Sequence, residues 1–376
     1  MKVLHLISGG DGGGAKTHVI TLLKRLMKEG INVELLCIME GVFTEEAKKE
    51  GIPIKIIHQK KRYSLKSIIE IKKYIAKGGY DIIHCHGARA NYISFFIKNS
   101  FNIPFITTLH SDYKLDFKDS IYKQAIFMPI NAIALRKFDY ILAVTEAFKN
   151  MLIERGFNKE KLKVIYNGIN MQKKIKPLDK KEFLKGFDIC YNEDYVYVGI
   201  AARLQQVKGL KHFLEASKYL LKTNKNIMFL IAGSGTLEDS MKTFIKENNL
   251  QDNVKMLGFV NDINSFYNVL DINVLTSYSE SFPYALLEGA RLKKATIATC
   301  VGGIPEMIKD NETGFLIKPH NSKELAKKID MLLKDKNLMS SFGESFYKYA
   351  YDHFSDEKMA KTHIDIYKNI LKETKK

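Results

Sequence analysis

The chain has 376 residues, enough for roughly two domains of ~150 residues that each bury their own core, which excludes a peptide or a disulfide mini-protein. Hydrophobic residues make up 45% and charged residues 27%, and 24 glycines and 7 prolines are too few for a collagen-like or low-complexity chain. The longest apolar runs, near 195–202 and 227–232, are far shorter than the ~20 residues that span a bilayer, so we expect no transmembrane helix. The first residues lack the long apolar stretch of a secretory signal, which predicts a cytoplasmic protein.

Cysteine spacing argues against a disulfide framework and against a cysteine-based metal centre. Four cysteines lie far apart without a C-x-x-C pattern: Cys37, Cys85, Cys190 and Cys300. We expect each of them to fill core space as a small apolar residue. His84 and His86 flank Cys85, but we expect alternate strand positions to point the two imidazoles to opposite faces, which would make them a poor metal chelate. The sequence therefore predicts no metal site and no cofactor.

The net charge of +17 is unevenly distributed. Residues 1–180 hold 31 lysines and arginines against 17 acidic residues, whereas residues 181–376 hold 28 against 25. An acidic partner, such as an anionic membrane, a phosphorylated lipid or a nucleic acid, would therefore contact the first half. A lysine-rich, solvated surface without a partner is the plain alternative.

The first half alternates short apolar runs with longer segments of helical period, the pattern of parallel βαβ units. Strands are predicted near 2–8, 32–39, 53–58, 81–86, 104–109, 140–144 and 162–166, with helices near 15–29, 64–77, 88–99, 118–137 and 146–155. One doubly wound parallel sheet follows from this order. A polar, lysine-rich stretch without a clear strand then runs to about 190, and we place the linker there.

The second half repeats the pattern. Strands are predicted near 195–201, 226–232, 254–258, 271–276 and 296–300, with helices near 208–222, 236–248, 262–269, 283–292 and 321–333. The predicted fold class is therefore α/β, with Rossmann-like, doubly wound domains over 1–175 and 190–355 that would face each other across a cleft at the carboxyl ends of their strands. Residues 356–376 have a helical period and would either cap the second domain or cross back to the first.

A glycine cluster follows the first predicted strand and opens a helix. Its last glycines are Gly12, Gly13 and Gly14. Glycines allow a backbone to approach a ligand closely, and a helix N-terminus offers free N–H groups to an anion, so the loop suits a phosphate or a sugar. A tight strand-to-helix turn without a ligand explains it too, and the phosphate-loop pattern G-x-x-x-x-G-K-[ST] is absent.

Cations follow the first strand of the second domain. Arg203 comes directly after it and Lys208 begins the next helix, so both stand at the carboxyl end of one strand. A guanidinium fork with an ammonium suits a diphosphate, although a solvated surface pair is the alternative. Gly233 follows the next strand and predicts a close backbone approach at the same edge.

Two carboxylates lie eight positions apart after the strand near 271–276. Glu280 precedes Pro283, which fits the first turn of a helix, and Glu288 lies inside that helix. Carboxylates accept hydrogen bonds from vicinal hydroxyls, so one would bind a ribose and the other a hexose. The alternative is that Glu280 merely caps the helix.

A histidine closes the strand near 104–109. His110 at that strand end would contact a reacting sugar, whereas a core histidine satisfied by hydrogen bonds is the alternative. His86 would line the cleft and His84 would belong to the core. The chain has no metal-binding D-x-D pattern, so Arg203, Lys208 and backbone N–H groups would have to neutralise a diphosphate.

Taken in order, these pieces resemble the retaining glycosyltransferases of family 4, which have the GT-B fold. The matching segments are Gly12 to Ala15, Asp81 to His86, Thr107 to His110, Val164 to Ile169, Arg203 with Lys208 and Gly209, Gly258 to Val260, Glu280 to Glu288 and Val301 to Glu306. They cover nearly the whole chain. The pair of glutamates around Phe-Pro is the most specific piece, and the ordered set is more specific than any one of them.

The resemblance implies a role for each matching residue. Arg203 and Lys208 would hold the diphosphate of a nucleotide sugar, Glu288 the ribose and Glu280 the transferred sugar. Backbone N–H groups near Phe282, Pro283 and Tyr284 would assist, and Phe259 and Val260 would flank the base. His110 would lie beside the anomeric carbon, and Gly12 to Gly14 would close over the donor. The family retains anomeric configuration, usually explained by front-face departure of the nucleotide.

The acceptor is predicted less sharply. By the resemblance it binds the first domain, the one with the excess of cations. The stretches 60–66 and 113–137 mix cations with apolar residues, as expected of a surface resting on anionic lipid, although a buried helix explains the second as well. We expect a peripheral enzyme at the inner face of the membrane that extends a lipid-linked or cell-surface glycan and binds no nucleic acid.

Other classes of function stay open. A nucleotide-sugar epimerase can share the fold and needs no acceptor. A dinucleotide oxidoreductase is disfavoured because no acidic residue ends the second strand, and a basic nucleic-acid- or membrane-binding protein would lack a compact recognition motif. The sequence leaves the base (UDP, GDP or ADP), the sugar and the linkage undecided.

Overall fold

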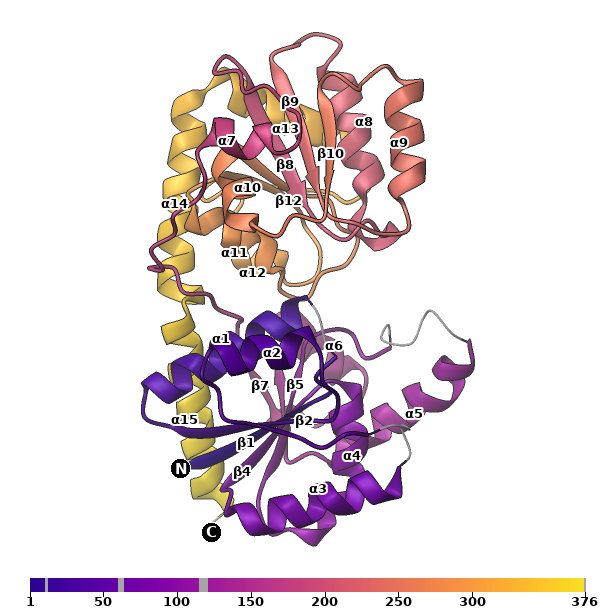
Figure 1. The fold of residues 1–376 in the computed structure, drawn as a ribbon, viewed down its shortest axis with the longest axis vertical. Coiled ribbons are helices and arrows are strands. Elements are labelled where there is room, and N and C mark those ends of the chain that lie inside the picture. The colour runs from indigo at the N-terminus through magenta and orange to yellow at the C-terminus, as the bar shows by residue number, and fades with distance from the viewer. Residues whose placement is uncertain (11–12, 60–63, 115–120, 375–376) are drawn as a thin grey trace. The chain divides into compact units, whose positions relative to one another are not determined.

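A computed structural model describes residues 1–376 except 11–12, 60–63, 115–120 and 375–376, and describes the backbone but not the side chains of 121–127. The chain divides into two compact units, each treated by itself below. Unit 1 comprises Met1–Asn170 together with Ser355–Lys376, and unit 2 comprises Met171–Phe354 (Figure 1).

Unit 1 is built from alternating strands and helices. In chain order they are β1 (Lys2–Ile7), α1 (Gly14–Lys28), β2 (Asn32–Cys37), α2 (Val42–Lys49), β3 (Ile54–Ile56), α3 (Leu65–Gly78), β4 (Ile82–His86), α4 (Ala88–Ile97), β5 (Phe105–Leu109), α5 (Ile121–Lys137), β6 (Tyr140–Ala143), α6 (Glu146–Glu154), β7 (Leu162–Val164) and α15 (Asp356–Thr374). Short 3-10 turns at Lys98–Ser100 and Lys159–Lys161 complete the unit.

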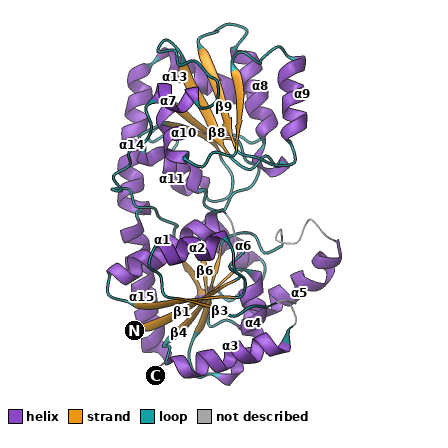
Figure 2. Ribbon diagram, viewed as in Figure 1, coloured by secondary structure: helices purple, strands orange, loops and turns teal. Residues whose placement is uncertain are grey.

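The seven strands of unit 1 form one parallel sheet in the order β3-β2-β1-β4-β5-β6-β7 (Figure 2). Helices cover both faces, so β4 and β5 are buried at every position, including the histidines of β4 and the threonines of β5. The order reverses between β1 and β4. In open α/β sheets, ligands bind outside the carboxyl ends of the strands at such a reversal.

Helix α15 belongs to unit 1 although it lies at the end of the chain. Its residues Met359, Ala360, Tyr367 and Ile370 are buried in the same apolar cluster as β1 and α1. The return is fixed by a backbone bond from the Asp356 N–H to the carbonyl of Ile169, 2.9 Å long. The apolar stripe of this helix is therefore buried against the first sheet.

Unit 2 repeats the architecture with fewer strands. Its elements are α7 (Lys180–Lys185), β8 (Val196–Ala201), a 3-10 turn (Gln206–Lys208), α8 (Leu210–Leu220), β9 (Ile227–Ala232), α9 (Glu238–Glu247), β10 (Val254–Gly258), α10 (Ile263–Val269), β11 (Ile272–Leu275), α11 (Tyr284–Arg291), β12 (Ala295–Thr299), α12 (Ile304–Met307), β13 (Phe315–Ile317), α13 (Ser322–Lys334) and α14 (Lys336–Phe354).

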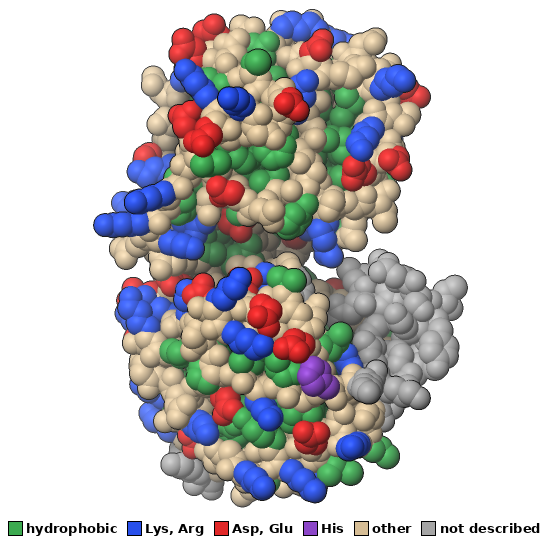
Figure 3. Space-filling model, in the orientation of Figure 1, with side chains coloured by type: hydrophobic (Ala, Val, Ile, Leu, Met, Phe, Trp, Pro, Cys, Tyr) green, Lys and Arg blue, Asp and Glu red, His purple; other side chains and the backbone are tan. Residues whose placement is uncertain are grey.

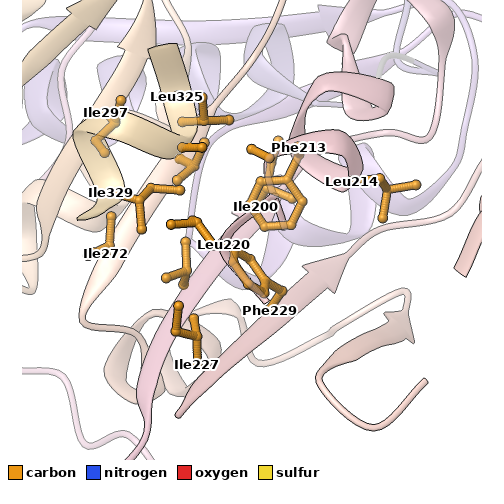
Figure 4. Packing of buried hydrophobic residues seen from close by; sticks show 14 of the residues in the cluster. Ile200, Phe213, Leu214, Leu220, Ile227, Phe229, Ile272, Ile297, Leu325 and Ile329 are labelled. Carbon is orange, nitrogen blue, oxygen red and sulfur yellow. The ribbon is translucent and has the colours of Figure 1, made fainter. Parts of the chain in front are cut away.

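The six strands of unit 2 are also all parallel, in the order β10-β9-β8-β11-β12-β13. On one face of the sheet, branched and aromatic side chains interlock, with Ile200 and Phe229 from the strands meeting Phe213 of α8 and Ile329 of α13 (Figure 4). The Phe213 and Phe229 rings meet edge to face, with centroids 5.6 Å apart. The order reverses between β8 and β11, the position that corresponds to the reversal in unit 1.

The structure contains elements that the sequence analysis missed. Helix α7 lies in the stretch assigned to the linker and packs on α10, where the Leu178 N–H donates to Ser265 Oγ over 2.7 Å. Helices α2, α12 and α14 and strand β13 were also missed. β13 has three residues and α12 four, too short for a hydrophobic period to be recognised.

The expected membrane contact can be compared with the helices of the protein and with the surface charges of unit 1. In the part of the chain that the structure describes, no helix is long and apolar enough to cross a membrane. Figure 3 shows Lys and Arg side chains of unit 1 interspersed with Asp and Glu on the visible face. The stretch 60–66 lies partly, and the stretch 113–137 largely, outside the described side chains.

Candidate functional site

The carboxyl edge of the unit 2 sheet collects polar side chains at the reversal between β8 and β11. Lys208 follows β8 and Glu280 follows β11, so elements 72 positions apart in the chain meet there. The Thr276 hydroxyl at the end of β11 donates to the carbonyl of Lys208 over 3.0 Å. The Tyr278 N–H also donates to the carbonyl of Val207 over 2.8 Å. The two strand-end loops are therefore joined by their backbones as well as by their side chains.

Lys208 and Glu280 form a half-buried ion pair. The Lys208 Nζ lies 2.6 Å from Glu280 Oε1, and the two side chains are 17% and 9% exposed. The Ser277 hydroxyl donates to the same carboxylate oxygen over 2.6 Å. Charge-assisted bonds at this distance are strong, so both charges are held ready at the sheet edge. Glu280 is not a helix cap: α11 begins with Pro283 at its N-cap, which makes no side-chain cap bond.

Arg203 follows β8 directly and has an exposed side chain. The sequence analysis placed it beside Lys208 as a cation pair. The structure instead gives Lys208 a carboxylate partner and leaves Arg203 at the surface of the same edge. This edge therefore offers the accessible guanidinium of Arg203 and an ammonium, that of Lys208, which is already paired.

Two glycines allow backbone segments at this edge to touch. A Cβ on Gly233, whose φ is +139°, would lie 1.9 Å from the carbonyl oxygen of Ala202. A Cβ on Gly302, whose φ is +54°, would lie 1.8 Å from the carbonyl oxygen of Glu280. Both contacts are too close for any side chain, so the glycines hold the loops that carry Arg203 and Glu280.

The predicted donor-binding residues around Phe259 and Phe282 divide into two groups by the exposure of their side chains. Phe259 is 72% exposed and follows β10, while its neighbour Val260 packs partly on the core. Phe282 and Tyr284 are buried instead, and the Phe282 ring meets Phe354 with centroids 5.1 Å apart. Of the four, the Phe259 side chain alone is largely open to a ligand, so the segment around Phe282 and Pro283 would act through its backbone.

Glu288 lies within α11, close to Arg291 of the same helix. Burial raises the pKa of its carboxyl, and the positive charge of Arg291 opposes that rise. Nearby, in the residues that the structure describes, the buried hydroxyls of Tyr267 and Tyr284 have no hydrogen-bond partner within normal bonding geometry.

The corresponding edge of unit 1 carries the glycine loop. Gly13, with φ +68°, is the N-cap of α1 and Gly14 is its first residue. Neither a side-chain cap nor an acidic residue occupies the first turn of α1. Gly12 lies outside the described residues. The two described glycines thus stand where a helix presents its first N–H groups.

A cavity of about 440 Å³ opens at this edge. It is lined by strand-end residues of β1, β4 and β5, among them Ser8, Gly10, His86 and His110, and by Arg89 at the start of α4. The guanidinium of Arg89 is held by the side chain and carbonyl of Gln59, at 3.0 and 2.9 Å. The cavity therefore lies at the reversal of the strand order, where a ligand is expected.

His110 lies at the end of β5 and faces this cavity, as the sequence predicts for the strand end. The loop after it is anchored by Asp112, whose carboxylate accepts two bonds from the Arg155 guanidinium, at 2.6 and 2.8 Å. Burial opposes ionisation of Asp112, but the Arg155 bonds prevail and lower its pKa. The loop that carries His110 is thus tied to the end of α6.

The expectation for His84 and His86 was wrong. Side chains alternate faces along a strand with a period of two, so positions i and i+2 share a face. The two imidazoles accordingly lie together, with ring centroids 4.3 Å apart, and Cys85 points to the other side. The two histidines therefore belong to one cluster, whereas the sequence analysis had assigned them to opposite faces of the strand.

Three members of that cluster were missed altogether: His5 of β1, His18 of α1 and His363 of α15. Two groups, His5 with His84 and His86, and His18 with His86 and His110, hold their ring nitrogens within 4.8 Å of one another. Their burial could have been predicted from the sequence, because each histidine stands among the apolar residues of a predicted strand or helix.

Two parallel-sheet α/β units, each with polar groups at the reversal of its strand order, are the architecture of the GT-B fold. Two family models match the chain: "Glycosyltransferase Family 4" over residues 12–173 and "Glycosyl transferases group 1" over residues 187–349. The chain belongs to this glycosyltransferase family and is an enzyme of that class.

Individual relatives of the chain are glycosyltransferases as well. An uncharacterised glycosyltransferase of Methanocaldococcus jannaschii is 29% identical over 341 residues, 89% of this chain and 88% of the relative. The capsular polysaccharide biosynthesis glycosyltransferase CapM of Staphylococcus aureus is 26% identical over 67% of each chain. Two relatives from Escherichia coli, each 23% identical, are an O-antigen biosynthesis glycosyltransferase and a UDP-Gal:alpha-D-GlcNAc-diphosphoundecaprenol alpha-1,3-galactosyltransferase.

A solved structure supports the fold. The Anabaena protein HepE in complex with UDP-glucose superimposes with a TM-score of 0.84, covering 98% of this chain and 100% of HepE at 21% sequence identity. At this identity the likeness bears on the fold alone, which is GT-B as the sequence analysis expected.

Proposed function

We propose that the protein is a retaining glycosyltransferase that moves a sugar from a nucleoside-diphosphate sugar to a lipid-linked or cell-surface glycan. The observation that carries this proposal is the Lys208–Glu280 ion pair, with Arg203 exposed at the same carboxyl edge of the unit 2 sheet. The edge combines cations for a diphosphate with a carboxylate for sugar hydroxyls. Both chemistries are needed for a nucleotide sugar.

Arg203 and Lys208 would bind the diphosphate and stabilise it as it leaves. The negative charge that develops on a departing nucleotide is best met by donors held in place beforehand. Lys208 is so held, by its 2.6 Å bond to Glu280, and Arg203 reaches the diphosphate from the surface. In this proposal the two side chains and backbone N–H groups do the work that a metal ion does elsewhere.

The remaining residues of unit 2 would define the orientation of the donor. Glu280 would accept hydrogen bonds from the transferred sugar and Glu288 from the ribose. Phe259, 72% exposed after β10, would stack on the base. Gly233 supports this arrangement because, lacking a Cβ, it lets the end of β9 approach the loop of Arg203.

Unit 1 would supply the acceptor side. His110 lines the 440 Å³ cavity and would lie beside the anomeric carbon, with Gly13 and Gly14 near the donor. The excess of cations in the first 180 residues suits an acceptor with an anionic carrier at the inner face of a membrane. The capsular polysaccharide relative favours a surface glycan as the acceptor class.

A thermal-shift experiment tests the donor assignment first. UDP, GDP, ADP, CMP and NAD would each be added to the wild type, since a ligand that binds the native state alone raises the melting temperature. UDP heads the series because HepE was solved with UDP-glucose. We expect one nucleoside diphosphate to stabilise the wild type but not Arg203→Ala.

The matched control is Lys211→Ala, because Lys211 is 71% exposed one helical turn from Lys208 and should leave the shift unchanged. A shift by NAD alone, or none at millimolar nucleotide, would contradict the proposal. Retention would be read from the anomeric configuration of the product once a donor is known, and an inverted product would overturn that part.

A further inference from the structure

The six clustered histidines of unit 1 form a connected group beneath its carboxyl edge. They are His5, His18, His84, His86, His110 and His363. All but His110 are at most 1% exposed. His5 stacks on His86 at 5.3 Å, and His86 stacks on His110 at 5.5 Å, measured between ring centroids. A stack of three imidazoles thus leads from the interior to the cavity.

Hydrogen bonds join the same three imidazoles. His5 Nδ1 lies 3.0 Å from His86 Nε2, and His86 Nδ1 lies 3.3 Å from His110 Nε2. Both nitrogens of His86 are therefore engaged, one with each neighbour. His86 and His110 line the cavity and His5 does not, so the chain of bonds runs from a fully buried ring to one that a ligand can reach.

The rings in this chain are neutral. Burial, with the nearby charge of His18 added, lowers the pKa of His5 to about 3, and burial lowers the pKa values of His86 and His110 well below the usual range. A neutral imidazole has one N–H and one lone pair. The position of one proton therefore determines the direction of each bond in the chain.

Two neighbours show which nitrogen carries the proton in this interior. His363 Nδ1 lies 2.8 Å from the carbonyl oxygen of Met359, which can only accept, so the proton is on Nδ1. His18 Nδ1 lies 2.8 Å from the Asn167 Oδ1. In both rings Nε2 is buried and, among the described residues, without a hydrogen-bond partner. Both thus bury a lone pair at Nε2.

The same rule applies to His5. Its Nε2 is buried and has no partner in the described part of the chain. An unpartnered N–H in the interior is rarer and more costly than an unpartnered acceptor, so the His5 proton is on Nδ1 and is donated to His86. His86 then carries its own proton on Nδ1 and donates it to His110 Nε2.

We infer that His5 and His86 are positioning residues that fix the tautomer of His110, with its Nε2 accepting from His86 and its proton on Nδ1. His110 is thereby a neutral hydrogen-bond donor through Nδ1 and is prevented from acting as a base through Nε2. The tautomer follows from the cluster alone, whereas its importance for sugar transfer rests on the proposed function.

A metal ion explains the cluster less well. Each of the two groups with converging nitrogens includes His86, both of whose nitrogens are already bonded to other rings. His84 likewise uses both nitrogens, with the Tyr367 hydroxyl at 2.6 Å and the Thr108 hydroxyl at 2.7 Å. An ion would have to break these bonds, so the histidine chain accounts for more of the geometry.

Imidazole nitrogen NMR tests the tautomer directly, since long-range proton–nitrogen spectra separate the Nδ1–H and Nε2–H forms. We expect the Nδ1–H form for His110 in the full-length wild type. His86→Leu removes the donor to His110 Nε2 and should shift the population toward Nε2–H. His86→Asn supplies an amide N–H near the former Nδ1 and should restore the wild-type spectrum.

His363→Leu is the matched control, because it removes a buried imidazole from the same cluster that is bonded to a backbone carbonyl outside the chain. It should lower the melting temperature as His86→Leu does, yet leave the His110 spectrum unchanged. An Nε2–H form of His110 in the wild type, or an unchanged spectrum in His86→Leu, would overturn the inference.

Activity gives the second readout. In His86→Leu we expect kcat to fall on the order of 10²-fold with little change in donor KM, as for a misdirected catalytic group, and His86→Asn to recover most of it. If instead His110→Ala transfers sugar as fast as the wild type, the proposed role of His110 fails, while the NMR result still stands or falls by itself.

Discussion

The two sheet edges have the same geometry and opposite chemistry. Each lies at the reversal of a parallel strand order, yet unit 1 builds its edge from neutral imidazoles and unit 2 from a lysine, an arginine and a carboxylate. The histidines lie deep in the layer between sheet and helices, where burial disfavours charge. Lys208 and Glu280 lie nearer the surface, where two opposite charges can be kept.

The difference shows that the shared fold does not determine the chemistry of the sheet edge. A doubly wound sheet decides where a ligand meets the protein, and the depth of the strand-end side chains decides whether they meet it with charge or with directed hydrogen bonds.

Mild acid should destabilise unit 1 far more than unit 2. The folded-state pKa values of the six histidines are lowered, to about 4 for His18 and about 3 for His5, so the unfolded chain binds more protons below pH 6.5. The stabilisation is complete above pH 6.5 and is lost as the pH falls, by about 1.4 kcal/mol per pH unit for each histidine that stays neutral when folded.

Hydrogen exchange of both units in one sample, between pH 7 and pH 5, measures the effect. Amides of β1 and β4 should lose protection, after correction for the intrinsic rate, before those of β8 and β11. Equal protection of unit 1 at both pH values would contradict the burial of neutral histidines as the source of the contrast.

The ion pair of unit 2 predicts opposite effects of its two members on nucleotide binding. Lys208→Met removes a charge-assisted bond to the diphosphate and should weaken UDP binding about 10- to 100-fold. Glu280→Gln frees Lys208 from its partner and should tighten UDP binding a few-fold while sugar transfer falls about 100-fold, because the hydroxyl acceptor is weakened. Calorimetry and a transfer assay separate the two.

Lys211→Met, at an exposed position on α8, should bind UDP as the wild type does. Equal weakening by Lys208→Met and Glu280→Gln would show that the pair serves the fold and not the diphosphate.

Glycines at the two edges should respond differently to alanine. Gly302→Ala in unit 2 places a Cβ 1.8 Å from the carbonyl oxygen of Glu280, in addition to the strain of φ +54°, and should cost upwards of about 2 kcal/mol. Gly87→Ala in unit 1 has φ +82° with ψ 163°, a region used almost only by glycine, and no described atom within 4 Å of the Cβ, so backbone strain alone, about 1–3 kcal/mol, is expected.

Urea unfolding of both variants checks this order. A Gly87→Ala variant that is less stable than Gly302→Ala would mean that the close loop packing belongs to unit 1 and not to unit 2.

The smallest effect is expected at the loop that holds His110. The pKa of Asp112 is lowered below its ordinary 3.8 by Arg155 in spite of burial, so its contribution to stability is complete above that value and is lost as the pH falls through the folded pKa. Asp112→Asn should therefore cost about 1 kcal/mol at pH 7, where the carboxylate is ionised.

Urea unfolding of wild type and Asp112→Asn at pH 7 measures the difference. Glu146→Gln serves as control, since its ion pair with Lys149 is half exposed and should change stability by only a few tenths of a kcal/mol. An Asp112→Asn variant as stable as the wild type would show that the bonds from Arg155 do not stabilise this loop.

The sequence by itself determined the alternation of strands and helices, and with it the class of fold. Apolar runs such as Ile227 to Ala232 are recognisable because parallel strands buried on both faces need no polar alternation. Glu280, Arg203 and His110 could be chosen because they lie within a few residues after such runs, and strand ends are where these sheets bind ligands. Local pattern was sufficient for these features.

Only the tertiary structure decided which side chains meet. His5, His18 and His363 come from three elements and give no common spacing, so no local rule brings them to His86. The pairing of Lys208 with Glu280, and the return of α15 to the first sheet, likewise join residues far apart in the chain. The physical reason is that periodicity reports the face of an element, whereas contacts between elements depend on how those faces are packed.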